Sequence, residues 1–419
     1  MAVEDIEAEL PSRLGHIRER LGLLGLFGVL AAFTLCTLDG GEVAPRLISA
    51  VFLVLAAVYL SVPFSQRLTL SWPVTCLLVM TLWGIAQTLF SPQKIVAKGW
   101  SGVLFWFTAA MIALVAAQLF QSARAAARFR WWFMLFAGAV CLLELLEQAS
   151  HTNFYYWAIE SKFRAVFGPF AYWNNFAQFV ELALPITLWM GLSKRRASPV
   201  PYLILAAVQI GAVVASGSRA GTALVLAELL VVIGLAYAKR RDRRLLLGAS
   251  LAFGLSLLFI YAAGFDVVIQ KLQQNDQLAV RRSINQSSLE MIRERPILGW
   301  GLQTYVPVYR MFAHYDDGTY VNHAHNDWFE WAAEGGIPFA ALMLAVFVWS
   351  VRPAVESVWG IGLVAICLHA MVDYPFARLG VCGWYFALVP MLASQVDERR
   401  RKAVSQVSTA KASTREAAA

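Results

Sequence analysis

The sequence predicts an all-α integral membrane protein with about twelve transmembrane helices, and three observations support this. Of its 419 residues, 59% are apolar and only 15% are charged, whereas an ordinary soluble domain carries about 25% charged residues. About a dozen stretches are apolar over the roughly 20 residues that a helix needs to cross a bilayer. All five cysteines lie inside such stretches, and no two form a CxxC pair. We therefore expect them to be buried apolar side chains.

The apolar stretches divide the chain into five parts. A charged cytoplasmic segment at 1–20 precedes spans one to nine, which lie within 21–265. A large loop at 266–335 follows, and spans ten to twelve lie within 336–394. The tail at 395–419 is polar and rich in Ala, Ser and Thr, so it is predicted to be disordered. The individual spans are predicted at 21–38, 47–63, 70–90, 101–120, 131–148, 175–192, 200–216, 220–238, 245–265, 336–350, 357–372 and 379–394.

The Lys and Arg residues of the short loops predict the orientation, because they gather on the cytoplasmic side. With the N-terminus in the cytoplasm, the short inside loops hold 13 basic residues and the short outside loops hold 5. An even number of spans also places both termini inside. The formal charge of +8 is thus a sign of topology, and we expect no nucleic-acid partner. The long segments 149–174 and 266–335 then lie outside, where chemistry on polar substrates belongs.

The first part of the large loop is predicted to contain a short helix. Residues 280–295 place Ile284 and Met291 on one face at helical spacing. Pro296 ends the helix, and the glycines of 299–301 form a turn. Two arginines, Arg281 and Arg282, stand at the start of this helix and are able to clamp a phosphate or diphosphate.

A third arginine, Arg219, lies in the tight outer turn Ser216-Gly217-Ser218-Arg219-Ala220-Gly221 between spans seven and eight. Backbone N–H groups and an arginine at a helix N-terminus form an anion site. The structural alternatives are that Arg219 snorkels to lipid headgroups and that Arg281 and Arg282 lie on a solvated helix face.

Two histidines, His323 and His325, stand just before a second short helix that is predicted at 327–334, with Asp327 as its N-cap and two glycines at its end. An extended HxH segment points both imidazoles the same way. A metal site and a general base are therefore both compatible with the pattern, as is a capping or packing role. The field of a helix N-terminus favours the neutral imidazole that a base requires.

Several polar residues lie inside predicted spans, where such groups are usually functional or paired within the bundle. These are Gln178 and Glu181 in span six, Glu228 in span eight, and His369 and Asp373 at span eleven.

Taken together, these segments resemble the bacterial O-antigen ligase/polymerase family of integral membrane glycosyltransferases. The matching segments run in the family's order from about 165 to 376: Gly168-Pro169 with Asn174 to Ala177, the Ser-Arg-x-Gly turn at 218–221, Arg281 to Gly301, NHAHNDWFEWAAEGG at 322–336 and HAMVDYP at 369–375. The sequence departs from the ligase motif at Phe339, and Asn285 stands where the family usually has Trp. Both departures bear on the choice between a ligase and a polymerase.

The resemblance implies an inverting, metal-independent enzyme without cofactors, at the periplasmic face of the bacterial inner membrane. Its donor would be a glycan on undecaprenyl diphosphate, and its acceptor a sugar hydroxyl of lipid A–core, or of a second lipid-linked glycan in a polymerase. His325 would be the general base, with Arg219 and Arg281, or Arg282 in a register shifted by one, on the diphosphate. The supporting residues would be His323, Asn326, Asn175, His369 and Asp373. A membrane transporter is the alternative of another class, but its polar groups should lie near the bilayer midplane, whereas the densest polar cluster here lies in an outer loop.

Overall fold

The computed structural model describes residues 3–36, 43–61, 68–90, 96–150, 154–155, 157, 159–160, 167–193, 198–240, 277–314 and 321–417, with residues 250, 254 and 258. Among these residues the regular secondary structure is helical, apart from one isolated bridge and one short antiparallel ladder. In that ladder β1 (Phe154–Tyr155) pairs with β2 (Ile159–Glu160). The predicted all-α class is confirmed.

Eight helices in the described part of the chain are long and apolar enough to cross a membrane. They are α2 (Val43–Ser61), α3 (Trp72–Phe90), α4 (Val96–Leu119), α5 (Ala123–Ala149), α6 (Trp173–Ser193), α8 (Arg219–Arg240), α13 (Asp327–Ser357) and α15 (Leu379–Ala417). A further apolar helix, α7 (Val200–Ser216), has 17 residues. The first predicted span falls on α1 (Val3–Leu35), which buries Leu23, Leu26 and Leu30 in the core.

Two predicted spans are not found as full-length helices, so the count of twelve is not confirmed. The ninth, 245–265, lies almost wholly outside the described residues. The eleventh, 357–372, is wrong: α14 (Ile361–His369) has nine residues, far fewer than the roughly 20 that cross a bilayer. The backbone leaves the helical region at Val358, with φ of 68°. Val358 is buried, so protein surrounds this irregular backbone.

The predicted disorder of 395–419 is also wrong for the residues up to Ala417, because α15 continues to that residue. The tail is rich in Ala, Lys, Arg and Glu, which are strong helix formers. Lys402 and Glu398 pair at 2.6 Å on one helix face, a spacing that supports an exposed helix.

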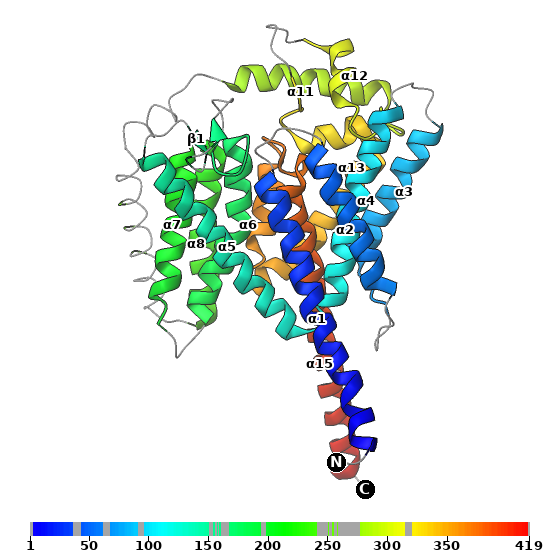
Figure 1. Cartoon of the computed structure of the whole chain (residues 1–419), viewed down its shortest axis with the longest axis vertical. Coiled ribbons are helices and arrows are strands. Elements are labelled where there is room, and N and C mark those ends of the chain that lie inside the picture. Colours follow the sequence, from blue (N-terminus) through cyan, green and yellow to red (C-terminus); the bar gives the residue numbers. More distant parts are fainter. Residues whose placement is uncertain are drawn as a thin grey trace.

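The two ends of the bundle differ in what they carry (Figure 1). At one end α1 and α15 pack together and extend beyond the other helices, so that both termini lie side by side. Across the opposite end lie α11 (Gln277–Glu294) and α12 (Tyr305–Phe312). The candidate loop residues therefore lie far from the termini, as the predicted topology requires.

The loop helices rest on the start of α13 through a small core of their own. Ile284 and Met291 are buried against Trp300 and Tyr305, which confirms the predicted inner face of the first helix. The turn after it docks through its backbone: the N–H of Trp300 donates to the Ala333 carbonyl at 2.9 Å.

Two glycines allow this close approach of the turn to α13. Gly299 and Gly336 have φ of 62° and 78°, and a Cβ on either would lie within 2.5 Å of the other segment's backbone. Such positive φ values favour glycine. Gly336 also kinks α13, which agrees with the predicted end of the short helix there.

The topology is open to a direct test. A reporter fused after Ala313, at the end of α12, should be active only as a periplasmic reporter, because the charge bias places 266–335 outside. Alkaline phosphatase and a cytoplasmic fluorescent protein at the same position form the matched pair. Fluorescence without phosphatase activity would contradict the predicted orientation and with it the periplasmic site.

Candidate active site

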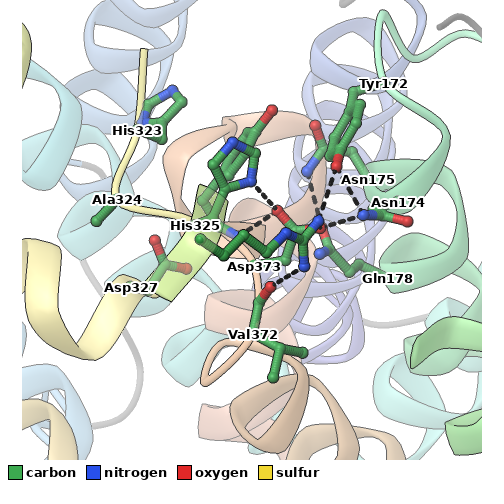
Figure 2. Close-up of polar contacts among 12 residues, drawn as sticks. Tyr172, Asn174, Asn175, Gln178, His323, Ala324, His325, Asp327, Val372 and Asp373 are labelled. Atoms are coloured by element: carbon green, nitrogen blue, oxygen red, sulfur yellow. Dashed lines mark hydrogen bonds and ion pairs between the residues drawn. The ribbon is translucent and has the colours of Figure 1, made fainter. Parts of the chain in front are cut away.

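A buried carboxylate, Asp373, lies at the centre of a polar cluster at the α11–α12 end of the bundle. Its side chain is 0% exposed and follows α14, where the chain turns back toward α15. One carboxylate oxygen lies 3.3 Å from His325 Nδ1, and the other accepts from the Asn174 amide. Figure 2 shows His325 and Asn174 gathered around Asp373. Residues about 50 and 200 positions apart in the sequence thus meet at one acid.

Arg281 joins the cluster from the first turns of α11. Its guanidinium lies 3.7 Å from Asp373 and donates to the hydroxyl of Tyr172 at 3.2 Å. It also donates to the Val372 carbonyl. The side chain is 18% exposed, so part of the guanidinium faces solvent. Arg282 is exposed on the helix surface, and the structure therefore separates the two arginines that the sequence left together.

His325 is held in an uncommon backbone conformation directly before α13. Its φ is 50°, a left-handed value that non-glycine residues rarely adopt and that occurs at functional sites. Its ring packs edge-on against Tyr374 at 5.0 Å between centroids, and its side chain is 21% exposed. The next residue, Asn326, is the N-cap of α13 and accepts from the Phe329 N–H at 3.2 Å. The predicted N-cap, Asp327, is instead the first helical residue.

His323 points to a different partner, so the expectation that both imidazoles face the same way is wrong. Its Nδ1 lies 2.9 Å from Glu330, and the same carboxylate accepts from the Ala324 N–H at 2.7 Å. The left-handed turn at His325 separates the two rings, as Figure 2 also shows. Among the described residues there is no group of three His, Cys, Asp or Glu side chains arranged to hold a metal ion.

Arg219 stands at the N-terminus of α8, beside the N-terminus of α6. Gly217 ends α7 in a left-handed conformation, with φ of 82°. The Ser218 hydroxyl then accepts from the Gly221 N–H at 3.2 Å, which confirms the predicted tight turn. A Cβ on Gly221 would lie 2.4 Å from that of Ala177, one turn beyond Asn174 on α6. Arg219 itself is exposed, as an anion site at a helix N-terminus requires.

Other predicted residues form hydrogen bonds or ion pairs with partners other than Asp373. Asn175 donates to Gln178 at 2.8 Å. His369 pairs with Glu181 at 2.7 Å, both fully buried within the bundle. Glu228 is buried as well. All of these polar side chains are buried in the bundle.

The local electrostatics keep Asp373 charged. Burial alone would raise its pKa, but the hydrogen bond from His325 and the charges of His325 and Arg281 together bring the pKa below the usual 3.8. Burial, followed by the charge of Asp373, raises the pKa of Tyr172 and of Tyr374. Asp373 is therefore ionised and the phenols of Tyr172 and Tyr374 are protonated near neutral pH.

Three residues that the sequence analysis did not select complete the site. Tyr172 and Tyr374 stack with their rings 5.4 Å apart, and Glu330 orients His323. Each stands in or beside a segment that carries the family resemblance, but nothing in the local sequence shows that these side chains meet.

The fold and this cluster define a polytopic membrane protein in which His325, the Asp373 carboxylate and Arg281 gather at one end of the helical bundle. Residues 201–345 match a protein-family model described as O-Antigen ligase. The matched segment, about a third of the chain, is similar to that family and includes Arg219, Arg281 and His325. No curated protein matches the chain in sequence.

Proposed function

We propose that this protein transfers a glycan from undecaprenyl diphosphate to a sugar hydroxyl of lipid A–core, at the periplasmic face of the bacterial inner membrane. The match to the O-antigen ligase model and the apolar helices support a bacterial membrane enzyme that acts on lipid-linked glycans. The observation that carries the finer proposal is the contact of His325 and Arg281 with the same buried carboxylate. This pairing supports the proposal, because it brings an imidazole and a guanidinium to the same acid.

His325 acts as the general base in this proposal. A carboxylate only accepts hydrogen bonds, so the shared proton lies on Nδ1 and the lone pair of Nε2 is left for the substrate. Asp373 thus sets the tautomer and stabilises the imidazolium that forms, as in other acid–histidine pairs. The contact of 3.3 Å is at the long end of the range and is expected to shorten when substrate binds.

The reaction is a single displacement. The acceptor oxygen attacks the anomeric carbon while its proton passes to Nε2 of His325. The bond from that carbon to the diphosphate oxygen breaks, and its electrons leave with undecaprenyl diphosphate. Attack opposite the leaving group inverts the configuration at this carbon. Arg219 and Arg281 neutralise the developing charge, so we expect transfer to continue in a chelator.

Asp373→Asn should lower the rate of transfer by about 10²–10⁴-fold while the protein still folds. The amide can donate to Nδ1 and so favours the wrong tautomer of His325. Because the pKa of Asp373 lies below its usual value, the wild-type carboxylate stays ionised at neutral pH, and the loss should be present throughout the range from about pH 7 to 9. Initial rates across this range, with thermal unfolding of both proteins, provide the check. Equal rates for the two proteins would remove Asp373 from the mechanism.

The functional test must distinguish the proposed ligase from two other functions, a polymerase and a transporter. A polymerase would use a second lipid-linked glycan as acceptor, and Phe339, at the departure from the ligase motif, is a core residue stacked edge-on with Trp106. A transporter would use the buried Glu181–His369 pair, since paired ionisable groups inside a bundle mark transport pathways.

Purified protein in liposomes, supplied with an undecaprenyl-diphosphate glycan, separates these functions. Lipid A–core is offered in one reaction and a second lipid-linked glycan in another, and the products are analysed by mass. We expect a lipid A–core product. Product only in the second reaction would indicate the polymerase, and movement of lipid-linked glycan across the bilayer without any transfer would indicate the transporter.

A further inference from the structure

A second, larger feature lies on the other side of His323 from the cluster. It is a cavity of about 650 Å³ at the loop end of the bundle, between α1, α2, α4, α12, the start of α13 and the start of α15. His323 lines it, but neither His325, Asp373 nor Arg281 is among its described lining residues. The cavity is thus separate from the proposed chemistry and adjacent to it.

Four cationic side chains from four parts of the chain line this cavity. They are Arg46 on α2, Lys98 on α4, Arg310 on α12 and Arg378 just before α15. Nothing in their spacing along the sequence joins them, so the fold alone brings them together. Cations that converge on one cavity attract an anionic ligand and raise its local concentration.

The three carboxylates in the lining are held by the wall itself. Asp327 accepts from the Phe376 N–H at 2.8 Å. Glu334 accepts from the Gln303 and Tyr305 N–H groups, both at 2.8 Å, and Glu330 accepts from the Ala324 N–H. The described lining thus holds four cationic side chains against three carboxylates, and these carboxylates already accept hydrogen bonds from the backbone.

The remainder of the cavity is apolar. Its lining includes large aromatic side chains on helices that span the bundle, among them Phe33, Phe105, Trp106 and Trp331. A cationic end over an aromatic interior fits an amphiphile whose headgroup carries phosphate and whose other part is hydrocarbon. A free sugar or a simple anion would use only half of this lining.

One aromatic layer separates the cavity from the proposed base. The His323 ring stacks on Tyr374 at 4.3 Å between centroids, and Tyr374 packs against His325 at 5.0 Å. A glycan extending from a headgroup in the cavity would pass over this layer to reach His325. Arg281 lies on the far side, where it contacts Tyr172 and Asp373.

We propose that this cavity binds the acceptor substrate as a phosphorylated glycolipid, with the phosphate groups at Arg46, Lys98, Arg310 and Arg378 and the hydrocarbon against the aromatic side chains. The inference rests on the proposed glycosyl transfer and adds a second site to it. Donor and acceptor then approach His325 from opposite sides of Tyr374. Both acceptor classes considered above, a phosphorylated lipid A–core and a lipid-diphosphate glycan, share this chemistry.

The test uses the double variant Arg310→Gln with Arg378→Gln, in nanodiscs. Loss of two charge-assisted contacts should raise the acceptor KM by about tenfold or more and leave the donor KM unchanged. Arg293→Gln, an exposed arginine of α11 outside the cavity, is the matched charge control. Wild-type enzyme should lose the same factor with an enzymatically dephosphorylated acceptor, and the double variant should lose little more. Thermal unfolding establishes that both variants fold.

The outcomes separate this inference from the function beneath it. A raised donor KM with an unchanged acceptor KM would show that the cavity holds the donor, and unchanged values for both would show that it holds neither; each overturns the inference. If the wild type transfers to neither acceptor, the proposed function fails, and direct binding of lipid A–core and of the lipid-diphosphate glycan decides about the cavity. Binding that weakens when Arg310 and Arg378 are replaced or when the ligand is dephosphorylated supports the site. Binding that neither change weakens overturns it.

Discussion

Replacing His325 by Ala should lower the rate of glycan transfer by about 10²–10⁴-fold, which is the usual contribution of a general base. A sugar hydroxyl is a poor nucleophile, and His325 is the imidazole that contacts Asp373. Donor binding should change little, because the diphosphate is assigned to the arginines. The loss should therefore appear in kcat rather than in the donor KM. Initial rates at saturating donor and acceptor provide the measurement.

His323→Ala is the matched control, because it removes the neighbouring imidazole, which pairs with Glu330 instead. It should cost less than His325→Ala. If the two histidines bind a metal, both substitutions should be equally severe and a chelator should inhibit the wild type. Full activity of His325→Ala would exclude it as the base.

Replacing Arg219 by Ala should lower transfer by at least about 10²-fold, the usual loss when a preorganised group facing the transition-state charge is removed. Arg219→Lys should rescue poorly, because an ammonium cannot reproduce the planar fork of a guanidinium. Arg281→Ala should be similarly severe and should also release Asp373 and Tyr172. Donor KM and kcat, measured for each variant at normal expression, show where the loss arises.

Arg282→Ala distinguishes the two neighbouring arginines, since Arg282 is exposed and Arg281 lies against the acid. We expect a clearly smaller loss for Arg282→Ala than for Arg281→Ala. Normal activity of Arg219→Ala would mean that Arg219 only anchors the helix to lipid headgroups. A larger loss for Arg282→Ala than for Arg281→Ala would assign the diphosphate to Arg282.

Local patterns predicted much of the architecture. The α11 helix and its buried face follow from apolar residues at helical spacing, and the turn at 299–301 follows from its glycines. The span corresponding to α14 was mistaken because hydropathy does not distinguish a helix in lipid from a short helix buried in protein. The helical tail was missed because a polar composition excludes a packed core without excluding a helix.

The geometry of the candidate site required the fold. His325 and Asp373 were both selected from the sequence, but their contact joins α13 to the turn after α14. The extended-chain assumption for the two histidines failed because His325 adopts a positive φ, which a sequence does not show for a residue other than glycine. The cavity also required the fold, because its four cations come from four separate parts of the chain.

The most direct test of the account is a single-turnover reaction of purified protein with an undecaprenyl-diphosphate glycan and lipid A–core, with His325→Ala in parallel. We predict that wild-type protein releases undecaprenyl diphosphate in amounts equal to the new glycosidic bond. The anomeric configuration should be inverted, and the variant should be slower by about 10²–10⁴-fold. Retained configuration, or equal rates for the two proteins, would contradict a single displacement assisted by His325.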